Sequence, residues 1–382
     1  MFKHYRIRDY DFKLIILVLA ASFIGILAIG SAKESLQSKQ IFGVISGFIL
    51  MVGISLFDYA TILKLNWLMY VANLILLGAT IFSTAGDTGG GAQRWLEIGP
   101  LRFQPSESAK IILILFFAQF IMKHKEKFNT FKYIMLCVIL VAIPWVLIFK
   151  QPDLSTSIIV LLLFCTIMFV GGLSYKVILG ILAVVLPTLI IFLGLALQPN
   201  SILVEKEIIK PYQLNRILAF VNPEEYATEE AYQQINSITA IGSGMLDGKG
   251  YKTNEVSSVI NGNYLSEPQT DFIFAVIGAE FGFKGRLVVG FILLFIALEC
   301  FSIATKAKDL AGTIIAGAMG GLVIFQSFVN LGVATFILPN TGLPLPFISY
   351  GLTSLWSLYM GMGFVLNVRL QGKKNGDKIR EG

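Results

Sequence analysis

Long apolar segments recur along the chain, and short polar connections separate them. Each segment has roughly 16 to 28 mostly apolar residues, the length at which a helix crosses a hydrocarbon layer of about 30 Å. The pattern predicts an all-α polytopic membrane protein in which residues 1–382 form a single membrane domain. The ten predicted spans are Leu14–Gly30, Ile41–Leu56, Leu65–Phe82, Ser108–Met122, Tyr133–Phe149, Ser155–Leu173, Val177–Leu197, Leu287–Thr305, Ala311–Leu338 and Ser349–Val368.

The placement of lysine and arginine predicts the orientation of these spans. Basic residues gather beside the span ends that lie on the same side as the N-terminus, and the positive-inside rule assigns that side to the cytoplasm. Both termini are then cytoplasmic, and residues 371–382 form a cytoplasmic tail. Residues 198–270 become a large extracytoplasmic loop between spans seven and eight. A loop of this length is expected to act as a lid or a binding surface.

Composition supports the membrane assignment and narrows the chemistry. The sequence is 55% hydrophobic and 14% charged, with a mean hydropathy of +0.74, which is typical of a chain surrounded by lipid. The net charge of +6 does not indicate nucleic acid, because the basic residues lie beside span ends, where they meet anionic membrane lipids. Both histidines, His4 and His124, map to the cytoplasmic side, so carboxylates must do any acid or base work outside.

Asp271 is the most unusual carboxylate, because it stands where the long polar loop gives way to an apolar segment. A carboxylate at a membrane boundary is costly unless it is paired or used. A structural interpretation is also open: Thr270 would be the N-cap of a helix over Asp271–Phe283, with Asp271 at the positive end of the helix dipole. That helix is too short to span, so we expect it to insert partway and to be sheltered by protein.

Polar residues also gather in the outward segment between spans three and four. Arg94 precedes Trp95, a pair suited to holding a phosphate at headgroup depth or, equally, to simple interfacial anchoring. Glu107 and Lys110 are three residues apart on a predicted helix, so they are expected to pair within the membrane. Ser106 is the predicted N-cap of that helix.

Two further outward segments carry candidate polar groups. Asp153 is expected to cap the helix that follows it, although an outward carboxylate is also able to hold a divalent cation near a pyrophosphate. In the large loop, glycines surround Lys249, where exposed amides and the ammonium would suit an anion. Apolar positions in the same loop predict helices that lie on the membrane.

The uncharged, proline-rich run Leu338–Gly351 is expected to form a rigid wall whose backbone is satisfied by protein or water. Glu299, deep in the eighth span, has no role in this interpretation.

Six ordered motifs resemble the SEDS family (shape, elongation, division and sporulation), most closely its RodA branch, and together they cover most of the chain. They are Gly91-Ala92-Gln93-Arg94-Trp95, Phe103-Gln104-Pro105-Ser106-Glu107 with Lys110, Gln151-Pro152-Asp153-Leu154, Ala240-Ile241-Gly242-Ser243-Gly244, Thr270-Asp271-Phe272-Ile273-Phe274-Ala275-Val276 and Gly342-Leu343-Pro344-Leu345-Pro346-Phe347-Ile348-Ser349-Tyr350-Gly351.

The resemblance implies a ten-helix peptidoglycan glycosyltransferase in the bacterial cytoplasmic membrane. It would polymerise lipid II at the outer face and work with a class B penicillin-binding protein, and Asp271 matches the family's essential aspartate. The chain departs from the family at Met245 and Leu352, where glycine is usual, and at Pro268-Gln269, where a histidine is common. These departures bear on fine substrate geometry more than on the class of reaction.

The resulting hypothesis makes Asp271 the general base of an inverting transfer between two lipid-linked sugars. Mg²⁺ or Mn²⁺ would assist, with no organic cofactor. Two alternatives remain open at this stage: a lipid II flippase, which would need ionisable groups distributed through the membrane, and a noncatalytic scaffold of the cell-wall complex. The candidate pyrophosphate ligands are Arg94, Arg102, Lys110, Arg216 and Lys249, and the candidate supporting residues are Glu107, Asp153, Thr270 and Ser349.

Overall fold

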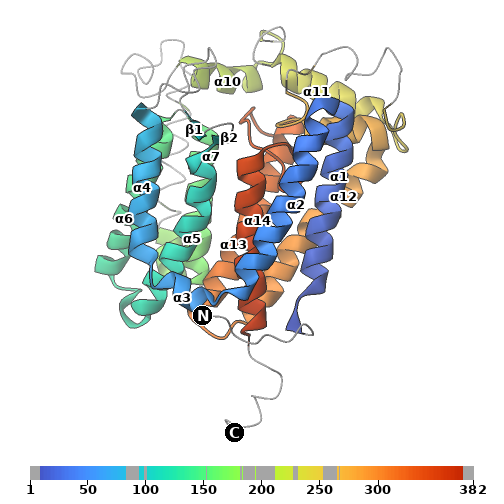
Figure 1. The fold of residues 1–382 in the computed structure, drawn as a ribbon. Helices are drawn as coiled ribbons and strands as arrows, with labels where there is room; N and C mark the ends of the chain where they lie inside the picture. The colour runs from blue at the N-terminus through green and yellow to red at the C-terminus, as the bar shows by residue number, and fades with distance from the viewer. Residues whose placement is uncertain are drawn as a thin grey trace.

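A computed structural model shows a bundle of long helices with a layer of short helices across one end (Figure 1). The structure describes residues 9–82, 94–98, 101–151, 153–180, 183, 194, 211–226, 231–252, 265 and 267–372. Its elements are α1 (Phe12–Ala32), α2 (Glu34–Leu56), α3 (Tyr59–Leu63), α4 (Asn66–Phe82), β1 (Leu96–Ile98), β2 (Leu101–Phe103), α5 (Pro105–Lys123), η2 (Lys125–Lys127), α6 (Phe131–Lys150), α7 (Leu154–Val170), α10 (Pro211–Val221), α11 (Tyr232–Ser243), α12 (Ile273–Thr305), α13 (Leu310–Ala334) and α14 (Leu352–Leu370).

Helices occupy nine of the ten predicted spans within the described residues. Six of them, α1, α2, α5, α6, α12 and α13, are long and apolar enough to cross a membrane, and α4 and α7 are shorter apolar helices. The remaining predicted span, Val177–Leu197, lies mostly outside the described residues. The predominantly helical fold is therefore confirmed, with six helices that could cross a membrane by length and composition, although the β1–β2 hairpin departs from the all-α prediction and the number of ten spans stays a prediction.

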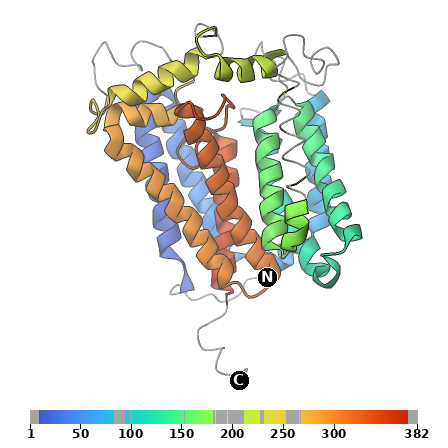
Figure 2. The ribbon, with the colours of Figure 1, turned by 180° about the vertical axis from the view of Figure 1, so that it is seen from behind.

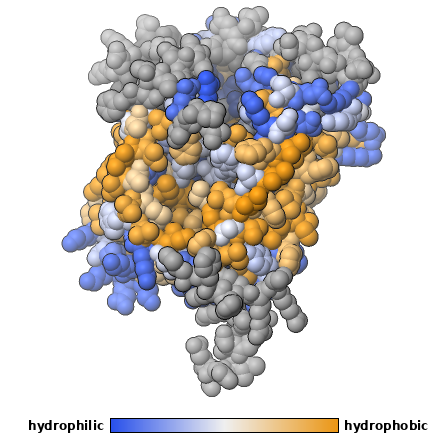
Figure 3. Space-filling view, in the orientation of Figure 1, coloured by the Kyte–Doolittle hydropathy of each residue, from blue (hydrophilic) through white to orange (hydrophobic). Residues whose placement is uncertain are grey.

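The two ends of the bundle differ in character. The described chain ends meet at one of them, where Arg369 Nε lies 3.8 Å from Asp11 Oδ2. At the opposite end, α10, α11 and the β1–β2 hairpin lie across the bundle (Figure 1). On the face drawn in Figure 3, an apolar band crosses the middle of the molecule between two more polar ends. We call the end that carries α10 and α11 the loop end, and the other the terminal end.

Helices α5 and α13 form the interior of the bundle. In the most apolar stretch of α5, 83% of the residues are buried, whereas only 28% of the residues are buried in that of α6. Helix α13 packs against α5, α7, α12 and α14. The polar groups of α5 and α13 therefore lie inside the protein rather than against lipid, as membrane-embedded polar groups require.

Helix α12 contains a sharp break near its start. Gly282 has φ 61° and ψ −155°, a backbone conformation open essentially only to glycine, and it separates a short first part of the helix, residues 273–281, from the long remainder. Figure 2 shows the two parts at an angle, with the short part beneath α11. The partial insertion predicted for Asp271–Phe283 agrees with this short buried part, although the helix begins at Ile273.

Side chains bind the carbonyl groups of the proline-rich run Leu338–Gly351. Gln326 Nε2 donates to Pro344 O at 3.0 Å and Asn330 Nδ2 donates to Leu343 O at 2.7 Å. Gln234 Nε2 from α11 donates to Leu338 O at 2.8 Å. These contacts confirm the prediction that protein groups satisfy this irregular backbone, which is thereby held against α13.

Candidate active site

Three successive carbonyl groups fix the backbone at Asp271. The carbonyl of Gln269 accepts from the amide of Tyr350 at 2.9 Å. The carbonyl of Thr270 accepts from Ser349 Oγ at 2.6 Å, and that of Asp271 accepts from Asn330 Nδ2 at 2.9 Å. The segment before α12 is thus held by α13 and by the proline-rich run, and none of these bonds uses the Asp271 carboxylate.

The Asp271 carboxylate is half-buried and makes no hydrogen bond or ion pair with the part of the chain that the structure describes. A Cβ added to Gly342, whose φ is 73°, would lie 3.3 Å from Asp271 Oδ2. The missing side chain therefore leaves room beside the carboxylate. Because Asp271 also carries no capping bond for α12, whose N-cap is Phe272, its side chain remains available to a substrate.

Desolvation and charge together set the proton affinity of this carboxylate. The pKa of Asp271 is raised from 3.8 to about 6 in all: burial raises it most, the charge of Arg216 lowers it, that of Glu267 raises it, and that of Arg94 lowers it. Arg216 lies on α10, where its Nη1 donates to Asn340 O at 3.4 Å. Arg94 Nε donates to Gln151 O at 3.2 Å. The structure thus brings two of the predicted pyrophosphate ligands, Arg216 and Arg94, near Asp271 from distant segments of the chain.

A groove of about 870 Å³ opens at the loop end next to this segment. Its wall includes Thr270, the residue immediately before Asp271, together with Trp95 and Arg102 from the hairpin region. Arg102 Nε lies 3.3 Å from Glu97 Oε1, with the Arg102 side chain 59% exposed. The groove is completed by Leu36, Ser38, Lys39, Phe42, Glu267, Gln269, Tyr350, Gly351 and Leu352.

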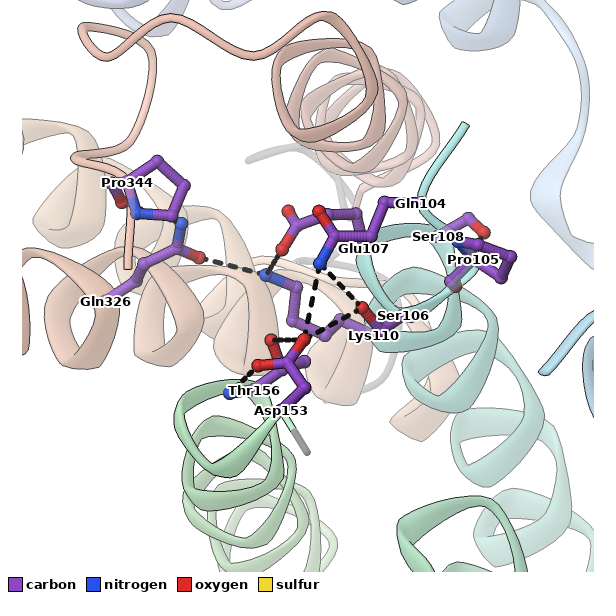
Figure 4. Close-up of polar contacts among 10 residues, drawn as sticks. All are labelled: Gln104, Pro105, Ser106, Glu107, Ser108, Lys110, Asp153, Thr156, Gln326 and Pro344. Atoms are coloured by element: carbon purple, nitrogen blue, oxygen red, sulfur yellow. Dashed lines mark hydrogen bonds and ion pairs between the residues drawn. The ribbon is translucent and has the colours of Figure 1, made fainter. Parts of the chain in front are cut away.

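A polar cluster beneath the site joins α5, α7 and α13 (Figure 4). Asp153 caps α7 by accepting from Thr156 N at 3.1 Å, as predicted. Its other oxygen accepts from Ser106 Oγ and from Gln104 Nε2, each at 3.3 Å. The prediction that Ser106 is the N-cap of α5 is therefore wrong. Gln104 holds that position, and Ser106 lies in the first turn of the helix.

The predicted pair of Glu107 and Lys110 is confirmed at 2.9 Å, with Lys110 only 1% exposed (Figure 4). Lys110 Nζ also donates to Gln326 Oε1 at 3.2 Å. Since Gln326 in turn donates to Pro344 O, this charge supports the proline-rich run from below. The structure does not bring Lys110 into the groove, and its contact with substrate stays a prediction.

Lys249 lies at the far end of the short part of α12. Its amide donates to Ala279 O at 2.9 Å, and the Gly250 amide donates to Glu280 O at 3.0 Å. The prediction of exposed amides here is therefore wrong, because these amides donate to backbone carbonyls. Lys249 is absent from the groove wall, so its role as a substrate ligand also stays a prediction.

Thr270 does not cap α12, which corrects the structural interpretation given for it. Its hydroxyl donates to Glu267 O at 3.2 Å, in the turn before the helix. Its carbonyl instead receives the Ser349 hydroxyl. Thr270 and Ser349 thus meet at the backbone of the site, in keeping with the supporting position predicted for both.

Sequence reasoning missed the two amide side chains of α13. Gln326 and Asn330 are four residues apart, so they share one face of the helix. Two amides at that spacing inside a predicted apolar span were a usable signal, because buried polar groups need partners. It also missed Lys39 and Glu267, which line the groove. Their charges at a predicted span end and near the end of the large loop were the available signal.

Comparison with known proteins gives matches that extend over nearly the whole chain. The family model FTSW_RODA_SPOVE, described as "Cell cycle protein", matches residues 11–374. Peptidoglycan glycosyltransferase RodA of Treponema pallidum (strain Nichols) is 28% identical over 429 residues, which cover 95% of this chain and 98% of that protein. Peptidoglycan glycosyltransferase MrdB of Escherichia coli (strain K12) is 35% identical over 305 residues, covering 80% and 78%.

Solved structures give the same result in three dimensions. A chain from a peptidoglycan synthase complex, described as coordinating polymerization and crosslinking, matches with a TM-score of 0.74 and 27% identity, covering 94% of this chain and 97% of that one. The Thermus thermophilus rod shape determining protein RodA matches with a TM-score of 0.68 and 26% identity, covering 96% and 98%. The likeness therefore includes the loop end as well as the apolar bundle.

Proposed function

Because this chain belongs to the FtsW, RodA and SpoVE family, we propose that it is a membrane-embedded peptidoglycan glycosyltransferase that polymerises lipid II during cell-wall elongation. Relatives that match most of its length carry the name peptidoglycan glycosyltransferase. The reaction takes place at the loop end, which faces the outside of the bacterial cytoplasmic membrane. Ten helices cross that membrane, and both termini are cytoplasmic.

Asp271 acts as the general base of a single displacement. Its carboxylate takes the proton from the sugar hydroxyl of an acceptor lipid II, and that oxygen attacks the anomeric carbon of the growing chain. The bond from this carbon to the undecaprenyl pyrophosphate breaks, the pyrophosphate leaves with the bonding electrons, and the configuration inverts. The pKa of about 6 suits the role, because a base works best when its pKa is near the working pH.

Arginine side chains stabilise the charge that develops on the pyrophosphate. Arg216 and Arg94 are the cations whose charges lower the pKa of Asp271, and Arg102 lies on the groove wall. Guanidinium groups bind phosphate oxygens through paired donors, which favours these three residues over the two predicted lysines.

A divalent cation, Mg²⁺ or Mn²⁺, fits this site only as a partner of the substrate. The described residues contain no group of three or more His, Cys, Asp or Glu side chains placed to hold a metal ion. Magnesium at phosphate sites often needs only one or two carboxylates, with phosphate oxygens and water completing its coordination. Exposed Glu267 on the groove wall would hold such an ion, which supplies positive charge at the leaving pyrophosphate.

The partner of the chain is a class B penicillin-binding protein that cross-links the new strands. The support for this proposal is the similarity to a chain from a peptidoglycan synthase complex described as coordinating polymerization with crosslinking. The groove at the loop end receives the polar heads of lipid II molecules, while their lipid tails stay in the apolar band.

The observation that carries the mechanism is a carboxylate with a fixed backbone and no bonded partner among the described residues, one residue along the chain from Thr270 on the groove wall. The purified protein is given labelled lipid II in the presence and absence of Mg²⁺, and glycan polymer is measured. We expect Asp271→Asn to lower the rate of polymer formation by at least about 100-fold while keeping at least the parent melting temperature. Asp247→Asn is the matched control, because Asp247 is 69% exposed and pairs with Lys284 at the other end of the short part of α12. Undiminished polymer from Asp271→Asn would refute the assigned base.

The same preparations separate the two other functions. A flippase would move labelled lipid II across vesicle membranes in a manner indifferent to Asp271, without making polymer. A scaffold would make no polymer itself and would support a partner equally well with or without the Asp271 carboxylate. Polymer made by the isolated chain, and lost only with that carboxylate, excludes both.

A further inference from the structure

A second pocket lies at the terminal end, opposite the proposed catalytic groove. It has a volume of about 460 Å³, within the usual range for small-ligand sites. It is formed where α3 leads into α4 and where α5 ends, beside the turn η2. Its lining residues are Lys64, Asn66, Trp67, Gln119, Phe120, Lys123 and His124.

The polar lining of this terminal pocket suits an anion. Lys64 and Lys123 are exposed, and neither ammonium makes an ion pair within the described residues. No aspartate or glutamate lines the pocket. Helix α4 begins at Asn66, so the positive end of its dipole lies at the pocket and adds to the charge of the two lysines.

His124 presents one defined ring edge to its surroundings. Its Nδ1 donates to Phe120 O at 2.8 Å, and its ring lies between those of Phe120 and Tyr133, at centroid distances of 4.7 and 5.0 Å. The ring is therefore held in place by packing. The second nitrogen, Nε2, makes no hydrogen bond with the described residues.

One border of the terminal pocket is apolar and faces outward. Leu65, Trp67 and Leu68 are 54%, 51% and 65% exposed. The Trp67 ring packs edge-on against Phe116 at 5.1 Å and Tyr70 at 5.9 Å. An indole fixed beside exposed leucines is typical of the boundary between hydrocarbon and headgroups. The pocket thus combines two cations with an exposed apolar border.

We propose that this terminal pocket binds the phosphate headgroup of an anionic phospholipid from the leaflet at that end of the protein. The two ammonium groups hold the phosphodiester, and Asn66 and Gln119 provide neutral hydrogen-bonding groups for the rest of the headgroup. The acyl chains leave over Trp67 and Leu68. A soluble anion would use the cations but would gain nothing from that apolar border, which is why the lipid is the favoured source of the phosphate.

The test uses the full-length protein in nanodiscs of phosphatidylcholine, with or without phosphatidylglycerol. Retention of phosphatidylglycerol is measured by native mass spectrometry, and melting temperature is measured alongside. The pocket variant is Lys64→Gln with Lys123→Gln. The control is Lys125→Gln with Lys127→Gln, which removes the same charge from the neighbouring turn, whose lysines do not line the pocket.

We expect the pocket variant to bind phosphatidylglycerol at least about tenfold more weakly, given the attraction of each lysine to an anionic lipid. The control should bind within about twofold of the parent. In pure phosphatidylcholine all three proteins should melt alike, which shows that folding is unaffected. Trp67→Leu should weaken lipid binding while leaving the charge unchanged.

Three outcomes would overturn the proposal. Equal losses in the pocket and control variants would mean diffuse attraction to the membrane surface. Unchanged binding in the pocket variant would place the lipid elsewhere. Saturable stabilisation by inorganic phosphate in pure phosphatidylcholine, lost with Lys64 and Lys123 and equal to that given by the lipid, would identify a site for a soluble anion.

Discussion

Two carboxylates stand at opposite ends of the short part of α12 and are held in opposite ways. Glu280 is 2% exposed, and its Oε1 accepts from the Ser31 hydroxyl and from the Lys252 amide. Asp271 is held by its backbone carbonyl instead, and its carboxylate makes no such bond among the described residues. The difference separates a carboxylate that fastens structure from one that is left available for chemistry.

The surroundings of the two carboxylates differ in the same sense. Around Glu280, glycines allow the backbone of the large loop to approach closely: a Cβ on Gly248 would meet Glu280 O at 2.1 Å. Beside Asp271, the absent side chain of Gly342 leaves space next to an oxygen. One end of the short helix is closed by close packing, and the other is open beside a groove.

Removing each carboxylate gives the largest expected contrast. Asp271→Asn should lower the polymerisation rate by about 10² to 10⁴, the usual contribution of a general base. Glu280→Ala should keep the rate within about threefold but destabilise the protein by about 1–3 kcal/mol, because the Ser31 hydroxyl and the Lys252 amide lose their acceptor. Rates with labelled lipid II and melting curves measure the two effects. A folded Glu280→Ala protein without activity would break the comparison.

Asp271→Asn should not destabilise the fold. Since burial raises the pKa of Asp271 from 3.8 to about 6, the charged carboxylate disfavours the folded state above pH 6 and has no such effect below pH 3.8. The asparagine variant should therefore melt at or above the parent temperature at pH 7. At pH 3.5 this advantage should be gone.

Filling the space beside Asp271 is the next largest expected effect. In Gly342→Ala the new Cβ would lie 3.3 Å from Asp271 Oδ2, so the rate should fall by about tenfold to a hundredfold through misplacement of the base. Gly172→Ala is the control, because Gly172 also has a positive φ, 90°, but open space around its Cβ position. It should show the same backbone strain in melting curves with unchanged kinetics. Equal rates for the two variants would argue against crowding at Asp271.

Loosening the backbone at Asp271 should have a smaller effect. Asn330→Ala removes the donor to Asp271 O and Leu343 O, and we expect kcat to fall by about tenfold with KM nearly unchanged. Gln234→Ala is matched, because Gln234 likewise donates to two carbonyls, those of Val333 and Leu338. A KM effect of equal size in both variants would indicate general loosening of the loop end rather than positioning of the base.

The smallest expected effect is on pH dependence. With a pKa of about 6 for Asp271, kcat/KM should be half-maximal near pH 6 and should fall about tenfold for each pH unit below it. Arg216 lowers this pKa, so Arg216→Gln should move the acidic limb to higher pH. Glu280→Gln should leave the limb in place. A limb that shifts with Glu280 but not with Arg216 would reverse the two roles.

Much of the fold follows from local sequence because apolar segment length is a local property. Nine of the predicted spans overlap helices that the structure describes. The Asp153 cap and the Glu107–Lys110 pair follow from spacings of three residues. Helix starts were less predictable. Thr270 and Ser106 have the right chemistry for caps, yet the Ser106 hydroxyl donates to Asp153 and the Thr270 carbonyl accepts from Ser349.

The site itself was only partly predictable. Asp271 is conspicuous in one dimension because a charge at a membrane boundary needs a reason. Its fixed geometry depends on Asn330 and Ser349, which lie 59 and 79 positions from their partners in the sequence. No periodicity or spacing indicates which distant side chain will meet a given carbonyl. The groove likewise combines segments from both halves of the chain, including Lys39 and Glu267.

The carbonyls of residues 269–271 have a consequence for how the protein is made. Their donors lie at positions 330, 349 and 350, so a nascent chain that has only reached α12 contains Asp271 without the groups that hold its backbone. Biosynthesis therefore delays this arrangement until the chain has been extended through residue 350. A ribosome product that stops after α12 would contain Asp271 and the charged residues of the groove wall, Lys39, Arg102 and Glu267, but none of the three donors that hold the backbone at Asp271.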